Sequence, residues 1–247
     1  MKFIAIIPAR YASSRFPGKP LADMKGKTMI QRVYEQVSLA IDNICVATDH
    51  PDIEEAVKAF GGNVIRSQQQ HNNGTERCRE AYHLLGGKED VIINIQGDEP
   101  FIKPQQIRDI ISCFNNPDTR IATLARPFTP DEGWDALANP NSPKVILNNN
   151  SEAIAFSRSV IPYIRGVEPH QWLEHHTFYK HIGMYAFHAE TLDRLSQLPP
   201  SPLESAESLE QLRWLENGYR IRVAITSQET IGIDTPQDLQ RALQLLP

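Results

Sequence analysis

Cysteine is scarce in this chain, and the spacing of the few cysteines fits neither a disulfide framework nor a zinc site. The 247 residues include Cys45, Cys78 and Cys113, an odd number with no Cys-x-x-Cys pair. We therefore expect free thiols and a reducing compartment, which is the cytoplasm.

The sequence also lacks a long apolar run. Its first apolar stretch, residues 3–7, is shorter than the apolar part of a signal peptide, and no later stretch approaches the roughly 20 residues that span a bilayer. We expect no membrane insertion.

There is no excess of positive charge either, because the chain has 25 Lys and Arg against 30 Asp and Glu, for a net charge of −5. This balance argues against a nucleic-acid partner.

Neither glycine pattern of the common phosphate-binding loops occurs, so any phosphate would be held mainly by side-chain charge. The apolar run at residues 3–7 leads directly into a loop, residues 8–20, that carries Arg10, Arg15 and Lys19. Three prolines and one glycine restrict this loop, and the end of a first strand is where an open α/β sheet binds its ligand. These features favour a triphosphate-binding loop over the alternative of a solvated basic loop.

Apolar runs and amphipathic patterns alternate through the first half of the chain, as in parallel βαβ units. We predict an α/β protein with a mostly parallel central sheet flanked by helices. The expected strands of this half are 3–7, 43–47, 63–66 and 90–95, and the expected helices are 27–40, 51–60, 75–85 and one from 104.

The second half is less regular, and residues 162–180 show no clear period. We interpret this stretch as part of an inserted subregion at about 148–190, within a single domain of residues 1–247, that makes an oligomer contact. The expected strands here are 121–125, 144–147, 153–157, 181–187 and 221–225, and the expected helices are 205–217 and one from about 236.

Asp98 lies in the segment Gln96–Pro100, directly after the strong strand predicted at 90–95. Because the carboxyl ends of parallel strands face the ligand crevice, its carboxylate should lie on the same side as the three cations. Mg²⁺ prefers hard oxygen ligands and takes one or two protein carboxylates together with phosphate oxygens. Asp98 is therefore the predicted magnesium ligand, although a simple turn residue before Pro100 is the alternative.

Asp234 is the best candidate for a second carboxylate, because it follows a predicted strand and precedes a helix that begins near Pro236. A helix N-cap is the competing interpretation. We favour the metal, since two carboxylates on the edge that also carries a triphosphate-binding loop suit Mg²⁺ better than either does alone.

Three stretches, residues 10–20, 96–100 and 232–236, resemble the signature segments of the 3-deoxy-manno-octulosonate (Kdo) cytidylyltransferases, or CMP-Kdo synthetases. The resemblance extends over almost the whole chain, and the order and spacing of the segments make it specific. The other matching segments are 47–50, 74–77, 156–158, 181–185, 200–204 and 209–213.

The resemblance implies a Rossmann-like nucleotidyltransferase fold, a homodimer, and the reaction of CTP with Kdo to give CMP-Kdo and pyrophosphate for lipopolysaccharide biosynthesis. It implies Mg²⁺ bound by Asp98 and Asp234, and a triphosphate held by Arg10, Arg15 and Lys19. These five residues are the predicted catalytic set. Gln96 and Arg77 are candidates for contacts to the nucleotide, with the sugar acid as the alternative partner.

Kdo is a carboxylate with many hydroxyl groups, so its site needs a cation and several hydrogen-bonding groups. The residues that match the family's sugar-binding segments are Arg158, His181, Tyr185, Glu210 and Gln211. Without the resemblance, His181 would be an ordinary strand histidine and Glu210 and Gln211 a solvated helix face. Two other functions stay open at this point: a nucleotidyltransferase for another sugar acid, such as a sialic acid, and a non-catalytic nucleotide-binding regulator.

Overall fold

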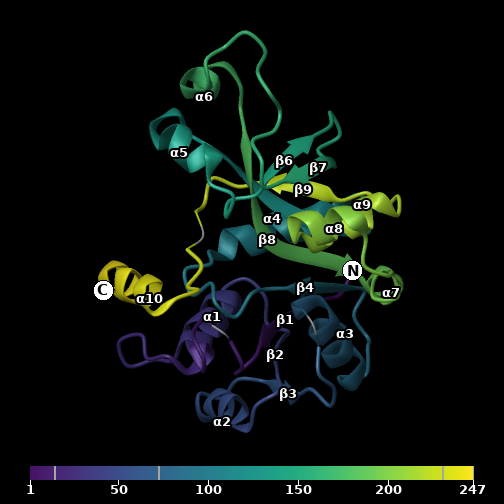
Figure 1. The fold of residues 1–247 in the computed structure, drawn as a ribbon. Helices are drawn as coiled ribbons and strands as arrows, with labels where there is room; N and C mark the ends of the chain where they lie inside the picture. The colour runs from purple at the N-terminus through teal and green to yellow at the C-terminus, as the bar shows by residue number, and fades with distance from the viewer. Residues whose placement is uncertain (14, 72, 230, 247) are drawn as a thin grey trace. The chain divides into compact units, whose positions relative to one another are not determined.

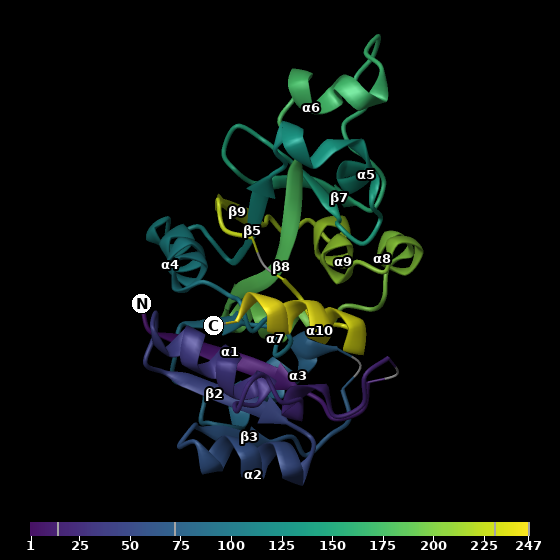
Figure 2. The same cartoon turned by 90° about the vertical axis from the view of Figure 1, so that its left-hand side faces the viewer.

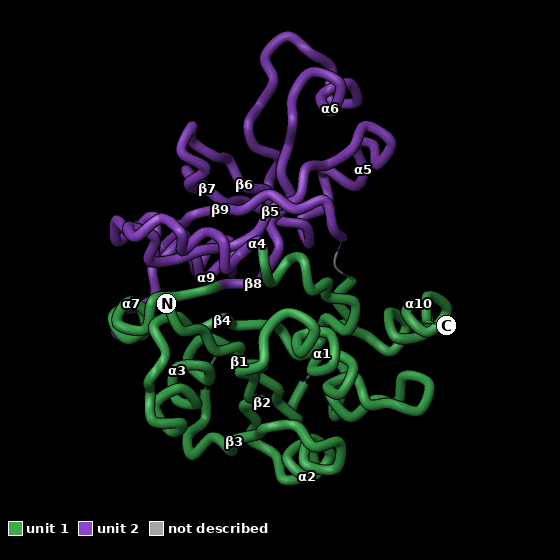
Figure 3. Tube along the Cα trace, turned by 180° about the vertical axis from the view of Figure 1, so that it is seen from behind, with its two compact units in different colours: residues 1–108, 186–196, 230–247 green, residues 109–185, 197–229 purple. Residues whose placement is uncertain are grey.

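The computed structural model describes residues 1–13, 15–71, 73–229 and 231–246, so Ser14 of the cationic loop lies outside the described residues. It confirms the α/β class, with a mostly parallel mixed sheet and flanking helices (Figure 1). The chain divides into two compact units, coloured separately in Figure 3. Unit 1 comprises residues 1–108, 186–196 and 230–247, and unit 2 comprises residues 109–185 and 197–229.

Unit 1 is built on four parallel strands in the order β3-β2-β1-β4. In the register, Ile6 of β1 lies between Cys45 of β2 and Asn94 of β4. Most side chains of β1, β2 and β4 are buried, as expected when helices cover both faces of a parallel sheet. The bounds are β1 Phe3–Ala9, β2 Ile44–Thr48, β3 Val64–Arg66 and β4 Val91–Asn94.

The helices that connect these strands begin at side-chain caps. Thr28, His50 and Asn73 each accept a hydrogen bond from a backbone N–H of the first turn. Helices α1 and α3 lie on opposite sides of the strands, as Figures 1 and 2 both show. Both faces of the sheet in unit 1 are therefore covered. The bounds are α1 Met29–Ser38, α2 Pro51–Ala59 and α3 Gly74–Leu84.

The C-terminal helix α10, Pro236–Leu245, begins at a capping box in which Thr235 and Asp238 exchange hydrogen bonds. Its Ala242 packs with Met24, Met29 and Ile233 in a cluster next to the cationic loop. This packing fixes the segment that carries Asp234. The other short elements of unit 1 are the 3-10 helix η1, Lys19–Leu21, and α7, Ala189–Leu195; α4, Pro104–Ser112, runs across the boundary of the units.

Unit 2 contains a parallel pair, β5 with β9, and an antiparallel pair, β6 with β7, of which β6 also pairs with β8. One cluster of its core consists of Phe128, Leu137, Trp172 and Phe178. The strand bounds are β5 Ile121–Pro127, β6 Lys144–Leu147, β7 Ala153–Ser157, β8 Tyr179–His188 and β9 Arg222–Ile225. The helices are η2 Cys113–Asn115, η3 Pro130–Glu132, α5 Gly133–Ala138, η4 Pro169–Gln171, α6 Trp172–His175, α8 Pro202–Glu207 and α9 Glu210–Glu216.

The prediction of one continuous helix over 205–217 is wrong, because α8 and α9 are separate helices. Ser208 lies between them with φ 50°, a left-handed conformation that ends α8. The short helices α5, α6 and α7 were not predicted, since four to seven residues are too few to show a period.

The boundary of the two units at Tyr185 and Ala186 falls inside β8, and so inside the inserted subregion predicted at about 148–190. The division into one domain with an insertion stays a prediction. Among the described residues, no helix combines the length and the apolar character that crossing a membrane requires.

Candidate active site

The cationic loop is closed by backbone contacts around Gly18. The Gly18 N–H donates to the carbonyl of Tyr11 at 2.9 Å, and the Leu21 N–H donates to the Gly18 carbonyl at 2.9 Å. Gly18 has φ 69°, a conformation that side chains disfavour, and it directly precedes Lys19 at the start of η1. The turn at Gly18 therefore fixes the backbone position of Lys19.

Lys19 joins the two aspartates that the sequence analysis selected. Its Nζ lies 2.6 Å from Oδ2 of Asp98 and 3.2 Å from Oδ1 of Asp234, and its side chain is only 11% exposed. Nη2 of Arg15 lies 3.1 Å from Oδ2 of Asp234. The predicted convergence of the loop cations with both carboxylates at one edge of unit 1 is thus present in the structure.

Two backbone contacts, one on each side, hold Asp98 in place. A Cβ on Gly97 would lie 2.9 Å from the carbonyl oxygen of Pro8, so only glycine allows the chain after β4 to pass this close to the end of β1. On the other side, the Ile233 N–H donates to the Asp98 carbonyl at 2.9 Å, which ties the Asp234 segment to the Asp98 segment.

A cavity of about 360 Å³ opens at this edge of unit 1. All seven residues predicted for the nucleotide and the metal line it, although they come from four separate segments of the chain. These residues are Arg10, Arg15, Lys19, Arg77, Gln96, Asp98 and Asp234, and they are joined in the lining by Pro8, Ala9, Ser13, Pro20, His71, Asn73, Gly74 and Gly97.

His71 is a cavity residue that the sequence analysis did not identify. Its Nε2 lies 2.6 Å from Oε2 of Glu80 in α3, and its side chain is 8% exposed. The hydrogen bond from His71 helps to lower the pKa of Glu80 against the opposing effect of burial. A lone histidine in a polar loop gives no periodic signal, so only the folded contact reveals its place.

Unit 2 brings together part of the predicted sugar-acid set. Nε2 of His181 lies 3.0 Å from Oγ1 of Thr123, and the rings of His181 and Tyr185 lie 5.4 Å apart between centroids. Burial lowers the pKa of His181 to about 3, so the imidazole is neutral at physiological pH. Burial, with a smaller effect of the Glu210 charge, raises the pKa of Tyr185.

The other two residues of that set begin α9. Glu210 is half-buried and Gln211 is 4% exposed, so the alternative of a solvated helix face is wrong for Gln211. The Gln211 Nε2 is buried without a hydrogen-bond partner in the described part of the chain. Because an unsatisfied buried amide is costly, this group is suited to receive a ligand oxygen.

Arg158 is engaged by the backbone of unit 2. Its Nε donates to the Glu207 carbonyl at 2.6 Å, and its Nη1 and Nη2 donate to the carbonyls of Pro140 and Ser208 at 2.9 and 3.3 Å. The buried Lys144 donates to the Arg158 carbonyl at 2.6 Å, and burial lowers the pKa of Lys144 to about 8. The structure thus shows Arg158 in a structural role, and its predicted role in binding the sugar acid stays a prediction.

The Asp98 and Asp234 carboxylates fit a magnesium ion in the nature of their donor atoms. Both supply hard oxygens, and both already contact one cation, the Lys19 ammonium. In the described part of the chain they are not joined by a third His, Cys, Asp or Glu to form a complete metal site. Mg²⁺ could be held here only with oxygens from a nucleotide or water, as is usual for this ion with phosphate substrates.

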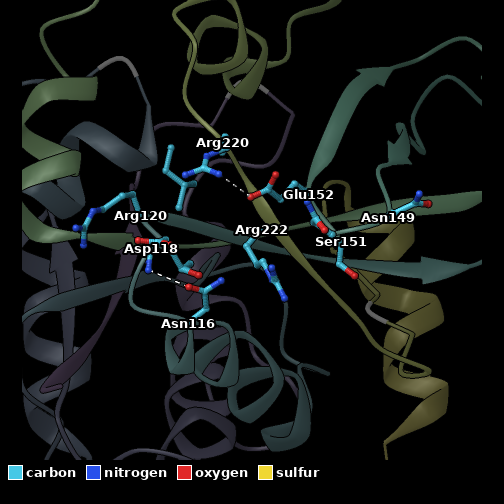
Figure 4. Close-up of a pocket in the computed structure, with 11 residues that line it drawn as sticks. Asn116, Asp118, Arg120, Asn149, Ser151, Glu152, Arg220 and Arg222 are labelled. Atoms are coloured by element: carbon cyan, nitrogen blue, oxygen red, sulfur yellow. Dashed lines mark hydrogen bonds and ion pairs between the residues drawn. The ribbon is translucent and has the colours of Figure 1, made fainter.

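A second cavity, of about 400 Å³, lies in unit 2 and contains none of the predicted site residues (Figure 4). Arg220 pairs there with Glu152 at 3.6 Å, and Asn148 donates to the same carboxylate at 3.2 Å. In Figure 4 the side chain of Arg120 points away from that of Arg222. The charges of this cavity therefore do not converge on one point.

Comparison with known proteins agrees with this geometry. Residues 4–223 match the family described as Cytidylyltransferase. The chain belongs to the cytidylyltransferase family.

Within that family, the chain is similar to proteins named 3-deoxy-manno-octulosonate cytidylyltransferase. The one from Parabacteroides distasonis is 64% identical, with 100% of this chain and 98% of the relative covered. The one from Bacteroides thetaiotaomicron is 59% identical over the same shares. A solved structure of CMP:2-keto-3-deoxy-manno-octonic acid synthetase complexed with CTP is 41% identical, with a TM-score of 0.90 and coverage of 99% of this chain and 98% of the other.

Proposed function

We propose that this protein transfers CMP from CTP to Kdo, releasing pyrophosphate, and serves lipopolysaccharide biosynthesis. The observation that carries the proposal is the cavity of unit 1, where Arg15, Lys19, Asp98 and Asp234 form one network of ion pairs. The similar structure complexed with CTP and the names of the curated relatives support the choice of substrates.

The residues of unit 1 suit nucleotidyl transfer, in which a sugar hydroxyl attacks the α-phosphorus and pyrophosphate leaves in line. The protein's tasks are then to orient the triphosphate and to neutralise charge on the leaving group. Arg10, Arg15 and Lys19 perform both tasks from one restricted loop. No side-chain nucleophile is needed, because the sugar acid supplies the attacking oxygen.

We infer that Asp98 and Asp234 hold Mg²⁺ together with the nucleotide. When bound, the ion would polarise the phosphate and help to ionise the attacking hydroxyl. The chain's own part is to keep the two carboxylates together, which it does through the backbone bond from Ile233 to Asp98 and through Lys19.

We assign binding of the sugar acid to unit 2, with His181, Tyr185, Glu210 and Gln211 as the contacting groups. The neutral imidazole of His181 and the buried amide of Gln211 offer directional hydrogen bonds to hydroxyl groups. Such groups suit a polyhydroxylated substrate. In the present conformation Arg158 supports the backbone around this set, and its guanidinium would have to exchange a carbonyl partner to reach a carboxylate.

We also propose that the protein is a homodimer of the cytoplasm. Apolar side chains of unit 2 are exposed, among them Ile154 at 58% and Tyr163 at 74%, and a second copy would cover such surface. Cys45, Cys78 and Cys113 are all buried thiols, which is consistent with a reducing compartment. Light scattering should give twice the mass of one chain.

The test is pyrophosphate release by the purified protein with CTP and Mg²⁺, comparing Kdo with a sialic acid. We expect release with Kdo and only background release with the sialic acid. Release with the sialic acid alone would refute the choice of sugar acid. CTP binding without turnover of either acid would refute the enzyme and favour a regulator.

A further inference from the structure

Asp49 connects two segments that form the proposed nucleotide cavity, the cationic loop and helix α3. It follows β2, and its Oδ1 accepts the backbone N–H of Tyr11 at 3.3 Å while its Oδ2 accepts Nη2–H of Arg77 at 2.9 Å. Asp49 is absent from the described residues that line the cavity, whereas Arg77 is among them. One carboxylate thus joins the cationic loop to helix α3 and is not itself part of the cavity lining.

Tyr11 is the residue that anchors the cationic loop. Its ring stacks on that of His50, with centroids 3.9 Å apart and planes at 19°, and its carbonyl accepts the Gly18 N–H at 2.9 Å. Arg10 directly precedes Tyr11, and Lys19 directly follows Gly18. A shift of Tyr11 would therefore displace two of the three loop cations.

Arg77 depends on Asp49 for its charge balance. Its side chain is 5% exposed, and its guanidinium lies 2.9 Å from the carboxylate of Asp49 and 3.4 Å from the hydroxyl of Ser67. A buried guanidinium that loses its carboxylate either moves or remains uncompensated, and both disturb the wall of the cavity. Asp49 itself is 35% exposed at the side chain, so its loss creates no void in the core.

We propose that Asp49 is a positioning residue for nucleotide binding: by holding Tyr11 and Arg77 at once, it sets the loop cations and the cavity wall in one arrangement. Preorganised cations bind a polyanion more tightly because little ordering remains to be done on binding. The proposal rests on the proposed function, since it takes the polyanion to be CTP.

The experiment compares Asp49→Asn with Asp193→Asn. Asparagine keeps an acceptor oxygen but loses the charge that pairs with Arg77. The control removes a similar carboxylate from unit 1, where Asp193 lies 2.7 Å from Arg79 and from His83 and does not line the cavity. The measurements are the Kd for CTP by calorimetry without Kdo, the KM values for CTP and Kdo, kcat, and the melting temperature.

For Asp49→Asn we expect a Kd for CTP about tenfold higher than wild type, the effect of losing one charged hydrogen bond. The KM for CTP should rise with it and kcat should fall, because the displaced loop cations also neutralise charge on the leaving group, while the KM for Kdo changes by less than about twofold. Asp193→Asn should leave the Kd for CTP within about twofold of wild type. This split between the substrates is a result that general destabilisation would not produce.

A folded Asp49→Asn protein with the wild-type Kd for CTP would overturn the proposal, as would an equal loss of affinity in both variants. If Asp49→Asn does not fold, Asp49→Ser is judged by the same criteria, and failure of that variant as well assigns Asp49 to folding instead. Wild-type protein that binds no CTP would refute the proposed function and this inference together. Wild-type turnover beside an unaffected Asp49→Asn would refute the inference alone.

Discussion

The buried imidazole of His181 makes the stability of unit 2 depend on pH in a way that can be calculated. Burial lowers the pKa of His181 from its ordinary value of 6.5 to about 3. Between these values the unfolded chain binds a proton that the folded protein does not. This contribution to stability is therefore complete above pH 6.5 and is lost as the pH falls toward 3.

The size of the effect follows from the shift. About pH 5 lies about 1.5 units below the pKa of histidine in the unfolded chain, and each unit is worth about 1.4 kcal/mol. Protonation of the unfolded state therefore lowers the free energy of unfolding by about 2 kcal/mol relative to about pH 7.5. Such a loss is a large fraction of the stability of an ordinary domain. His181→Gln removes the titrating group while keeping a side chain that can bond to Thr123.

Tryptophan fluorescence is a suitable probe, because Trp134, Trp172 and Trp214 are the three tryptophans of the chain and all lie in unit 2. Urea unfolding of wild type and His181→Gln at about pH 7.5 and pH 5 gives four free energies. Other titrating groups affect both proteins and cancel in the difference, so the wild type should lose about 2 kcal/mol more than the variant. Equal losses would show that His181 is protonated in the folded protein or is not buried.

Three further results are expected. Asp98→Asn should lower turnover by about 100-fold or more with little change in melting temperature, because it removes charge and not packing, and near wild-type turnover would refute the metal assignment. Gly97→Ala should lower the free energy of unfolding by about 1–3 kcal/mol, since its Cβ would lie 2.9 Å from the Pro8 carbonyl oxygen. Gly183→Ala is the control, because among the described residues, its own chain neighbours aside, no heavy atom lies within 4 Å of a Cβ placed there; equal losses in urea would contradict the close approach. Burial raises the pKa of Cys45 to about 12 and of Cys113 to about 11, so iodoacetamide should label them at neutral pH only after unfolding, and rapid labelling of the native protein, seen by mass spectrometry, would contradict that burial.

The convergence of the cationic loop with Asp98 was predictable because strand topology determines it. The cationic loop follows β1 and Asp98 follows β4, and these strands are parallel neighbours in the sheet. Their carboxyl ends must therefore meet at one edge. The helix start at Pro236 likewise marked the place of Asp234, and the capping function that competed for Asp234 belongs to its neighbour Thr235.

The residues that sequence reasoning missed act through contacts that exist only after folding. Asp49 lies 28 positions from Arg77, and Thr123 lies 58 positions from His181. No local spacing pairs them. The backbone contacts of Arg158 were unpredictable for the same reason. Two of its carbonyl partners, Glu207 and Ser208, depend on how α8 ends, and the left-handed conformation of Ser208 cannot be foreseen from the local sequence.

Unit 1 is assembled from three separate stretches, and its last stretch, residues 230–247, carries Asp234. A ribosome that has made every residue up to the end of unit 2 has therefore not yet supplied one of the two carboxylates, nor the helix that packs beside the cationic loop. The cavity of unit 1 can be completed only after this stretch has been made. Removal of this stretch by a protease would leave most of the sheet intact but take away the Asp234 side of the cavity.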